Sequence, residues 1–288
     1  MQAEPMVRWK TRRRERDLTA HAMIMGVLNV TPDSFSDGGQ FDALEPACAH
    51  VRQMVTAGAD IIDIGGESTR PGAAVVPADV EIARVVPIIA RLRAESDVWI
   101  SIDTSKAIVA EAALAAGADI VNDVTALTGD PKMAGVVAAA GAGVVLMHMQ
   151  GRPQTMQNSP LYADVVREVG EFLRQRMAAA IKSGIDPMCI ALDPGIGFGK
   201  SHDHNRELIL SLDQLGVEGR PMVIGVSRKS FLSWAADAPA LADRLWAGVA
   251  TTCFGRERGA RVFRVHDVRE HRDAVRMTEA ILQGMDDS

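Results

Sequence analysis

The chain alternates eight times between a short apolar run and a longer stretch with helical periodicity. The runs carry few polar residues, as strands that are buried on both faces of a parallel sheet do. They span residues 23–30, 61–66, 98–103, 119–124, 143–149, 189–195, 221–227 and 261–267. Eight β/α units in series predict an α/β fold, a TIM (β/α)8 barrel, in which the carboxyl ends of all strands meet around one site.

Glycines separate the units of this pattern. The predicted helices span residues 44–57, 79–95, 106–116, 131–140, 162–183, 205–214, 241–258 and 268–283. Five of them are followed by a glycine, namely Gly58, Gly117, Gly141, Gly184 and Gly259. Glycine commonly ends a helix in a left-handed turn. A doubly wound open sheet also alternates strands and helices, but it gathers its ligand at one switch point, so we favour the barrel.

Each apolar run ends on a polar residue. These residues are Asn29, Asp63, Asp103, Asn122, His148, Asp193, Lys229 and His266. Because strand ends converge on one face of a barrel, we expect them to surround a single site. This is the arrangement of an enzyme.

The length of the chain fits one domain. A chain of 288 residues that is 47% hydrophobic can bury one large core, and a barrel of about 250 residues is a normal single domain. We therefore expect one domain over residues 1–288. Residues 1–22 are charged and turn-like, with Trp9 and Leu18 as apolar anchors, and they predict a short N-terminal hairpin that plugs the bottom of the barrel.

Charge and cysteine usage exclude several other classes of protein. A net charge of −6 argues against a nucleic-acid partner, and we interpret the basic run at residues 10–16 as a solvated edge strand. No run is long enough for a membrane helix, and the N-terminus lacks the apolar segment of a signal peptide, so we expect a soluble, cytoplasmic protein. Cys48, Cys189 and Cys253 have neither disulfide nor zinc spacing and predict packing residues.

The loop after the first run is long and rich in small polar residues. It predicts a mobile lid or substrate clamp. Its first residues are Thr31, Pro32, Asp33, Ser34 and Phe35. Asn29, at the preceding strand tip, offers an amide that can either ligate Mg²⁺ or donate to an anion.

The segments after the next three runs combine acids, amides and one guanidinium. The turn at residues 67–72 suits a phosphate or carboxylate, although pairing of Arg70 with a surface acid explains this stretch equally well. Asp103 and Asn122 together can bind a flat heterocycle edge to edge, because acceptor and donor match adjacent N–H groups and a carbonyl. The structural alternative for Asp103 is a cap on the helix that starts near Ser105.

The last three runs lead into a glycine loop and a cationic set. In Asp193–Lys200 three glycines let the backbone approach a ligand, Phe198 presents an aromatic face, and Lys200 is interpreted as facing solvent. Arg264 and His266 are two residues apart and face the same side of their strand, near the Ser227–Ser230 loop. Together they indicate the phosphate site typical of a barrel. We interpret His148 as structural.

These motifs together resemble dihydropteroate synthase of the folate pathway. The motifs are Asn29-Val-Thr-Pro-Asp-Ser-Phe-Ser, Glu67-Ser-Thr-Arg-Pro-Gly, Ser101-Ile-Asp, Asn122-Asp, Asp193-Pro-Gly-Ile-Gly-Phe-Gly-Lys, Ser227-Arg-Lys-Ser and Arg264-Val-His. They occur in order from about Met23 to the end of the chain. The resemblance implies condensation of 6-hydroxymethyl-7,8-dihydropterin diphosphate with 4-aminobenzoate, with Mg²⁺, in a homodimer that is a sulfonamide target. Ile196 and Trp246 depart from the family pattern and predict a reshaped outer pocket or helix contact.

The resemblance also implies roles for individual residues. Those that match catalytic groups are Asp103, Asp193, Lys229, Arg264 and His266. Those that match the pterin site are Asp103, Asn122, Asp193 and Lys229, with Val124, Met147 and Gly197 in the substrate pocket. The diphosphate site matches Arg70, Arg264 and His266, and Asn29 matches the Mg²⁺ ligand. The 4-aminobenzoate pocket matches Thr69, Pro71, Phe198, Lys229 and Ser230, and Ser34 and Phe35 fall in the family's mobile first loop.

Two rival functions stay open. A pterin-dependent methyltransferase resembles this family in its pterin pocket, but it does not need the Ser-Arg-Lys-Ser loop or the Arg/His pair for a diphosphate. A catalytically silent paralogue that binds pterin is the other. For the synthase reaction we expect a dissociative path, in which Mg²⁺, Arg264 and His266 stabilise the departing diphosphate and no protein nucleophile takes part.

Overall fold

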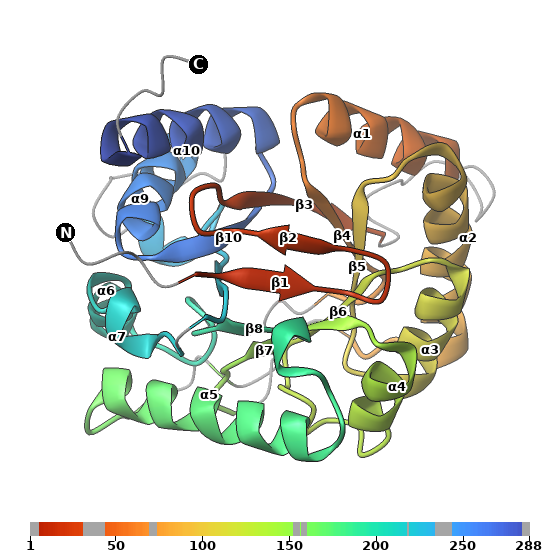
Figure 1. The fold of residues 1–288 in the computed structure, drawn as a ribbon, viewed down its shortest axis with the longest axis horizontal. Helices are drawn as coiled ribbons and strands as arrows, with labels where there is room; N and C mark the ends of the chain where they lie inside the picture. Colours follow the sequence, from red (N-terminus) through yellow and green to blue (C-terminus); the bar gives the residue numbers. More distant parts are fainter. Residues whose placement is uncertain are drawn as a thin grey trace.

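The structure, a computed structural model, describes residues 6–30, 44–68, 74–151, 156, 160–217, 219–233 and 244–283. Within these residues eight parallel strands close into a barrel, because the last strand, β10, pairs with the first, β3. Helices surround the barrel on all sides (Figure 1). The (β/α)8 barrel predicted from the sequence is thereby confirmed.

The strands lie where the apolar runs predict them, although most are shorter. They are β3 (Met23–Asn29), β4 (Ile61–Gly65), β5 (Trp99–Asp103), β6 (Ile120–Asp123), β7 (Gly143–Met147), β8 (Ile190–Asp193), β9 (Met222–Ile224) and β10 (Ala260–Val265). Two of the eight predicted polar ends are wrong. β4 continues past Asp63 and ends at Gly65, so Asp63 lies in the middle of its strand. β9 ends at Ile224, and Lys229 lies beyond it at the start of η3.

The helices follow the predicted order with shifted ends. They are α1 (Leu44–Thr56), α2 (Ala78–Glu95), α3 (Ala107–Ala116), α4 (Met133–Ala140), α5 (Val165–Lys182), α6 (His202–Leu210), α7 (Leu212–Leu215), α9 (Leu245–Glu257) and α10 (Val268–Gln283), with 3-10 turns η2 (Pro187–Cys189) and η3 (Ser230–Leu232). α6 begins before the predicted Asn205 because Ser201 and His204 form a capping box. All five predicted helix-ending glycines have positive φ, between 58° and 120°.

The interior of the barrel has two layers. The layer at the amino-terminal end is apolar and includes Ile61, Trp99, Ile120, Ala191 and Val262. Side chains two residues apart on a strand point to the same face. The next inward-facing residues along these strands are therefore Asp63, Ser101, Asn122, Asp193 and Arg264. The polar layer thus lies toward the carboxyl ends of the strands.

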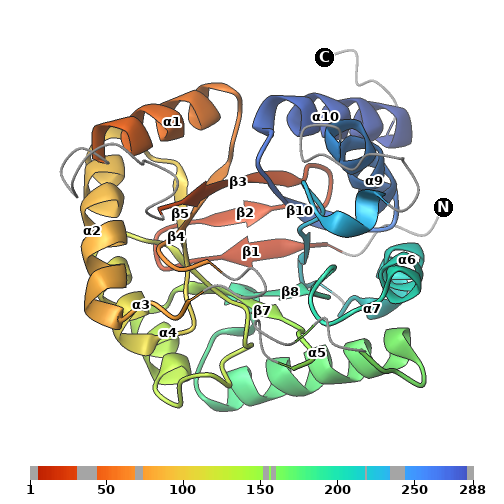
Figure 2. The same ribbon diagram turned by 180° about the vertical axis from the view of Figure 1, so that it is seen from behind.

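An N-terminal hairpin closes the apolar end of the barrel. Strands β1 (Arg8–Lys10) and β2 (Glu15–Asp17) pair antiparallel, and they cross the end of the barrel that faces the viewer in Figure 1. Trp9 and Leu18 are fully buried in the apolar layer. The Trp9 indole donates a hydrogen bond of 3.0 Å to the carbonyl of Cys189. This confirms the predicted hairpin, and Figure 2 shows the barrel from the opposite side.

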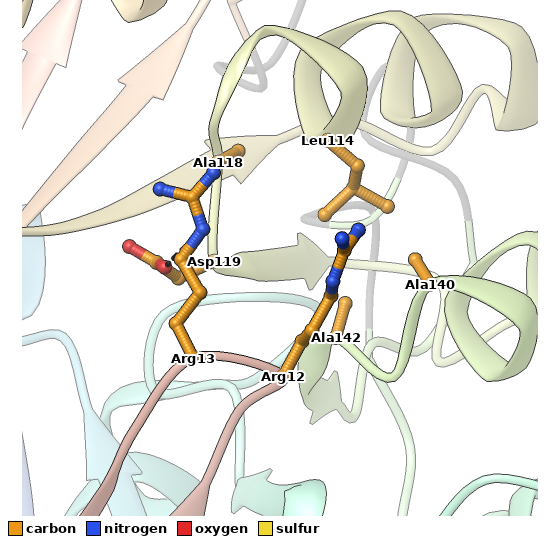
Figure 3. A pocket seen from close by; sticks show the side chains of 7 residues that line it. All are labelled: Arg12, Arg13, Leu114, Ala118, Asp119, Ala140 and Ala142. Carbon is orange, nitrogen blue, oxygen red and sulfur yellow. Dashed lines mark ion pairs between the residues drawn. The ribbon is translucent and has the colours of Figure 1, made fainter. Parts of the chain in front are cut away.

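The basic residues of the hairpin form ion pairs with acids around the rim of the barrel. Lys10 pairs with Asp186 at 2.8 Å, and Arg16 pairs with Asp60 at 2.9 Å. Arg13 lies 4.0 Å from Asp119 in a small pocket beside the barrel (Figure 3). Because Asp119 precedes β6, this pocket lies at the amino-terminal end, away from the polar layer.

Two further predictions concern membranes and cysteines. None of the described helices combines the length and the apolar character that a membrane span needs. Cys48 and Cys189 are buried and Cys253 is partly buried, and all three are free thiols. The prediction of packing residues therefore holds most clearly for the first two.

The first testable prediction concerns the plug. Trp9→Ala removes a fully buried indole and its hydrogen bond, so the free energy of unfolding should fall by about 3–5 kcal/mol in urea titrations. Trp246→Ala is the matched control, because this side chain is 71% exposed and its removal should cost less than about 0.5 kcal/mol. Equal losses in the two variants would contradict the role of the hairpin.

Candidate active site

A guanidinium between two carboxylates forms the centre of the polar layer. The Nε of Arg264 on β10 lies 2.6 Å from Oδ2 of Asp63 on β4, and its Nη2 lies 2.7 Å from Oδ2 of Asp103 on β5. The amide of Asn122 on β6 donates to the same oxygen of Asp63 at 3.2 Å. Four strands thus contribute to one hydrogen-bonded cluster, as the convergence of strand ends predicts.

Burial gives this cluster unusual acid–base properties. Removal from water raises the pKa of Asp103 to about 7; the charge of Arg264 opposes the shift and that of Asp63 adds to it. Burial alone would lower the pKa of Arg264, but the two carboxylates outweigh it and raise the pKa. Asp103 does not cap α3, whose N-cap residue is Lys106, so the structural alternative for this acid is wrong.

Asn29 lies next to the cluster at the end of β3. It pairs in register with Gly65, and Gly65 pairs with Asp103. A Cβ atom on Gly65 would lie 3.8 Å from both Oδ1 of Asn29 and Oδ2 of Asp103. Glycine at this position therefore leaves space that two side-chain oxygens border.

The glycine loop after β8 forms a second part of the site. Asp193 is buried, and its Oδ1 accepts a 2.7 Å hydrogen bond from the backbone N–H of Gly195. Burial raises the pKa of Asp193, although Lys229 counteracts the shift. The ammonium of Lys229 donates to the carbonyl of Ile196 and lies 4.5 Å from the centre of the Phe198 ring. Burial lowers the pKa of Lys229 to about 8, against the attraction of Asp193.

The segment after β9 and the end of β10 lie beside this loop. The Ser227 hydroxyl is 3.2 Å from both the backbone nitrogen and Nδ1 of His266. Arg228 adopts a left-handed conformation, with φ 60°, and binds the carboxylate of Asp267 with two nitrogens. Ser230 is exposed at the start of η3. The arrangement brings Ser227 and His266 together, as the sequence predicts for a phosphate site.

Lys200 contradicts its sequence interpretation. The side chain does not face solvent: the residue is 3% exposed, and Nζ lies 2.9 Å from Nδ1 of His148. Burial lowers the pKa of His148 to about 3, with a further contribution from Lys200, so the imidazole is neutral. His148 also packs edge-on against Phe172, which agrees with a structural role.

The other predicted residues are only partly placed. Val124 and Met147 are buried, and Met147 pairs in register with Asp193. Gly197 and Phe198 are partly exposed in the glycine loop. Ile196 is fully buried in the main core rather than in an outer pocket. Thr69, Arg70, Pro71 and the lid residues Thr31, Pro32, Asp33, Ser34 and Phe35 lie outside the described residues.

Asp63 was predicted to border the site as a strand end, but no binding or catalytic role was predicted for it. Its Oδ1 is buried and has no hydrogen-bond partner among the described residues. The Oγ of Ser101 is also buried and also has no partner among these residues. An unpaired buried acceptor is costly unless a ligand or water satisfies it. The sequence signal that could have identified Asp63 is the alternation of side chains along a strand. Asp63 is two residues after Ile61, which faces the barrel interior, so its side chain faces the interior as well.

An apolar groove between α6, η3 and α9 is the main competing cavity. It encloses about 420 Å³ and is lined by residues such as Phe231, Leu232 and Phe254. Ligand sites combine apolar walls with a few convergent polar groups and shifted pKa values. The residues with that combination are at the strand ends, so we place the active site there.

The second prediction tests the central ion cluster. In Arg264→Met the carboxylates lose their cation, so the free energy of unfolding at pH 7 should fall by about 3 kcal/mol. The pKa of Asp103, already raised to about 7, then rises further, and the folded state binds more protons than the unfolded state. Stability of the variant should therefore recover as the pH falls from 7 toward 5.

The control for this variant is Arg269→Met on the exposed face of α10. Its stability should follow that of the wild type at every pH, as urea titrations between pH 5 and 8 would reveal. A constant difference between Arg264→Met and the wild type over this range would contradict the electrostatic reading of the cluster.

Comparison with known proteins identifies the family. The family model described as pterin binding enzyme matches residues 25–266. The dihydropteroate synthase of Synechocystis sp. is 45% identical over 90% of this chain and 89% of that protein. A crystal structure of Yersinia pestis dihydropteroate synthase with a sulfonamide drug complex has a TM-score of 0.90 and 41% identity, and covers 96% of this chain and 100% of that one.

A second solved structure carries a ligand of a different kind. The dihydropteroate synthase of Xanthomonas albilineans with 4-aminobenzoic acid also has a TM-score of 0.90, with 42% identity over 97% of this chain and 100% of that one. The barrel, the polar strand ends and these likenesses agree with one another. The chain belongs to the pterin binding enzyme family and, within it, to the dihydropteroate synthases.

Proposed function

We propose that this chain condenses 6-hydroxymethyl-7,8-dihydropterin diphosphate with 4-aminobenzoate to give 7,8-dihydropteroate and diphosphate. The observation that carries the proposal is the cluster of Asp63, Asp103, Asn122 and Arg264, because it places acceptors for a flat heterocycle beside a cation for an anion. A relative that is 45% identical over most of its length carries the same activity in its name.

The pterin is recognised by hydrogen bonds in the polar layer. Its ring presents adjacent N–H donors and a carbonyl, which match the carboxylates of Asp103 and Asp193 and the amide of Asn122. All three residues are buried. Asp103 and Asn122 pair in register on the neighbouring strands β5 and β6, and Asp193 ends β8, on the far side of β7. The unpaired Oδ1 of Asp63 and Oγ of Ser101 are further groups that a polar ligand in this layer can satisfy.

The diphosphate is stabilised by cations and donors next to the pterin. Arg264 and His266 lie at the end of β10, and Arg70 is the third predicted contact. Negative charge develops on the leaving diphosphate as the C–O bond breaks, and positive groups held in a buried site stabilise it where it forms. In this role Arg264 exchanges a carboxylate partner for a phosphate oxygen.

We propose that Mg²⁺ binds in the space beside Gly65, where it would share Oδ2 of Asp103 with Arg264. The side-chain oxygens of Asn29 and Asp103 border this space, and hard cations prefer oxygen ligands. Mg²⁺ commonly binds through one or two protein oxygens together with water and substrate phosphates, so a larger cluster of acids is not required. When bound there, the ion supplies charge neutralisation for the diphosphate.

The reaction needs no protein nucleophile. The bond between the pterin methylene and the diphosphate oxygen breaks, a bond forms from the same carbon to the amine nitrogen, and that nitrogen loses one proton. The methylene carries positive charge between the two events, and the buried carboxylates of Asp103 and Asp193 stabilise it electrostatically. Mass spectrometric detection of a covalent enzyme adduct would contradict this path.

The arylamine binds against the glycine loop. Phe198 is partly exposed, and Lys229 and Ser230 lie on the neighbouring segment. Thr69 and Pro71 complete the proposed pocket, in which sulfonamides compete with 4-aminobenzoate. Solved relatives carry a sulfonamide drug complex and 4-aminobenzoic acid.

We further propose that the protein is a homodimer of the cytoplasm and has no nucleic-acid or membrane partner.

The third prediction is the activity itself. Purified protein with the pterin diphosphate, 4-aminobenzoate and Mg²⁺ should release diphosphate at a rate that depends on the arylamine. Lys229→Ala and Asp193→Ala should each lower turnover by at least about a hundredfold, because each removes a charge that contacts the substrates. A coupled assay for diphosphate measures both effects.

The same assay separates the rival functions. Tight binding of the pterin without turnover would indicate a silent paralogue, and methyl transfer from a methylated folate would indicate a methyltransferase. Full activity in the Lys229 and Asp193 variants would refute the roles assigned to these residues. Exposed Lys182→Ala serves as the control and should keep wild-type turnover.

The fourth prediction concerns the metal. Asn29→Ala removes one of the two oxygens beside Gly65, so the Mg²⁺ concentration for half-maximal turnover should rise by about tenfold, the usual size of such an effect. Turnover at saturating Mg²⁺ should recover most of the wild-type rate. Titration with Mg²⁺ after treatment with a chelator measures this, and an unchanged midpoint would exclude Asn29 as a ligand.

A further inference from the structure

The glycine loop lies directly on the segment that follows β7. Gly195 and Gly199 both have positive φ, of 67° and 63°. A Cβ atom on Gly195 would lie 1.9 Å from the carbonyl oxygen of His148, and one on Gly199 would lie 2.4 Å from that of Gln150. Only glycine permits this approach. The loop therefore packs directly against the backbone of His148 and Gln150.

Three side chains hold consecutive backbone groups of this loop. Lys229 donates to the carbonyl of Ile196. Oδ1 of Asn205 accepts from the N–H of Gly197 at 2.7 Å. Nζ of Lys200 donates to the carbonyl of Phe198 at 3.0 Å. Lys200 and Asn205 have no role in the function argued so far.

Lys200 is buried, and its ammonium finds enough acceptors there. The residue is 3% exposed. Its Nζ lies near Nδ1 of His148 at 2.9 Å, the carbonyl of Phe198 at 3.0 Å and the carbonyl of His148 at 3.4 Å. Three donors therefore meet three acceptors, which offsets part of the cost of burying the charge, and burial still lowers the pKa of Lys200 to about 7. Since the imidazole is neutral and accepts at Nδ1, its proton resides on Nε2.

The side chain of Asn205 is also buried and fixed by a hydrogen bond. It is buried in the first turns of α6, and its amide nitrogen donates to the carbonyl of Ser201 at 2.8 Å. This contact fixes the orientation of the amide and directs Oδ1 to Gly197. Lys200 and Asn205 thus form hydrogen bonds to the backbone on the two sides of the peptide bond that joins Gly197 to Phe198. We call these two residues the clamp.

The clamp fixes the position of Phe198. Its ring is partly exposed and lies 4.5 Å from Nζ of Lys229, in the proposed arylamine pocket. We infer that Lys200 and Asn205 are positioning residues, which set the affinity for the arylamine by fixing the backbone of Phe198 from behind. The inference rests on the proposed function, because it is the arylamine that Phe198 is proposed to contact.

The position of the clamp predicts a selective defect. Lys200 and Asn205 contact the loop beyond Gly195. Of the proposed pterin groups, Asp103 and Asn122 lie on other strands, and Asp193 ends β8 and bonds the loop only at Gly195, before the residues that Lys200 and Asn205 hold. Loss of either clamp residue should therefore weaken binding of the arylamine more than binding of the pterin diphosphate. A residue that only stabilises the fold would not separate the two substrates.

The test begins with Lys200→Met, which keeps most of the length of the side chain and removes its donors. The KM for 4-aminobenzoate and the inhibition constant of a sulfonamide should both rise by about tenfold, the value of one hydrogen bond to a charged group. The KM for the pterin diphosphate should change by less than about twofold. Exposed Lys182→Met is the matched control and should leave all three constants unchanged.

Asn205 provides a second variant pair in case Lys200→Met does not fold. Asn205→Leu removes the acceptor for the Gly197 N–H and should raise the KM for 4-aminobenzoate selectively. Asn205→Asp loses the donor to Ser201 but keeps an acceptor for the Gly197 N–H, so its KM should stay nearer to that of the wild type than the KM of Asn205→Leu, although a buried charge lowers its thermal midpoint. Across these two variants the KM for 4-aminobenzoate should thus depend on whether an acceptor for the Gly197 N–H is present and not on the thermal midpoint.

Two results would overturn the inference. They are an unchanged ratio of the two KM values in Lys200→Met and Asn205→Leu, and a KM that follows the thermal midpoint across the Asn205 pair. A wild type without turnover would refute the proposed function, and calorimetric binding of the sulfonamide with pterin diphosphate present would then decide the positioning roles. A wild type that neither turns over nor binds the sulfonamide would refute both.

Discussion

The site depends on one guanidinium held between two buried carboxylates. Asp63 and Asp103 lie on neighbouring strands in the polar layer of the barrel, and Arg264 binds one oxygen of each. Two acids in such a place are tolerated because the cation compensates them. Without ligand the cation is thus retained at the place where the diphosphate is proposed to bind. Substrate binding then exchanges one anionic partner of Arg264 for another.

The layering of the barrel explains why the polar groups gather at one end. The plug of Trp9 and Leu18 completes an apolar layer at the amino-terminal end of the strands. Water is excluded from that end, so polar residues are confined to the inward-facing positions of the next layer. The candidate site thus occupies one end of the barrel interior, and the apolar plug closes the other end. Changes in the plug and in the site should be largely separable for this reason.

Much of this could be predicted from the sequence because it rests on local signals. Apolar runs, helix-ending glycines and polar strand ends are periodic, and they predict the barrel and bring Asp103, Asn122 and Arg264 to one place. The burial of Lys200 was missed because its partner His148 is 52 residues away, and their contact depends on the path of the glycine loop. Asp63 was taken for a strand end because alternation was not followed through to Gly65. The early start of α6 came from a capping box with histidine in place of the usual acid or amide.

A structure of the protein with the pterin diphosphate and Mg²⁺ bound tests the central claim most directly. The account predicts the pterin ring against Asp103 and Asn122, the metal next to Asn29, and the guanidinium of Arg264 within hydrogen-bond distance of a phosphate oxygen. Electron density for the ligand in the apolar groove between α6 and α9, with Arg264 still bound to both carboxylates, would contradict it.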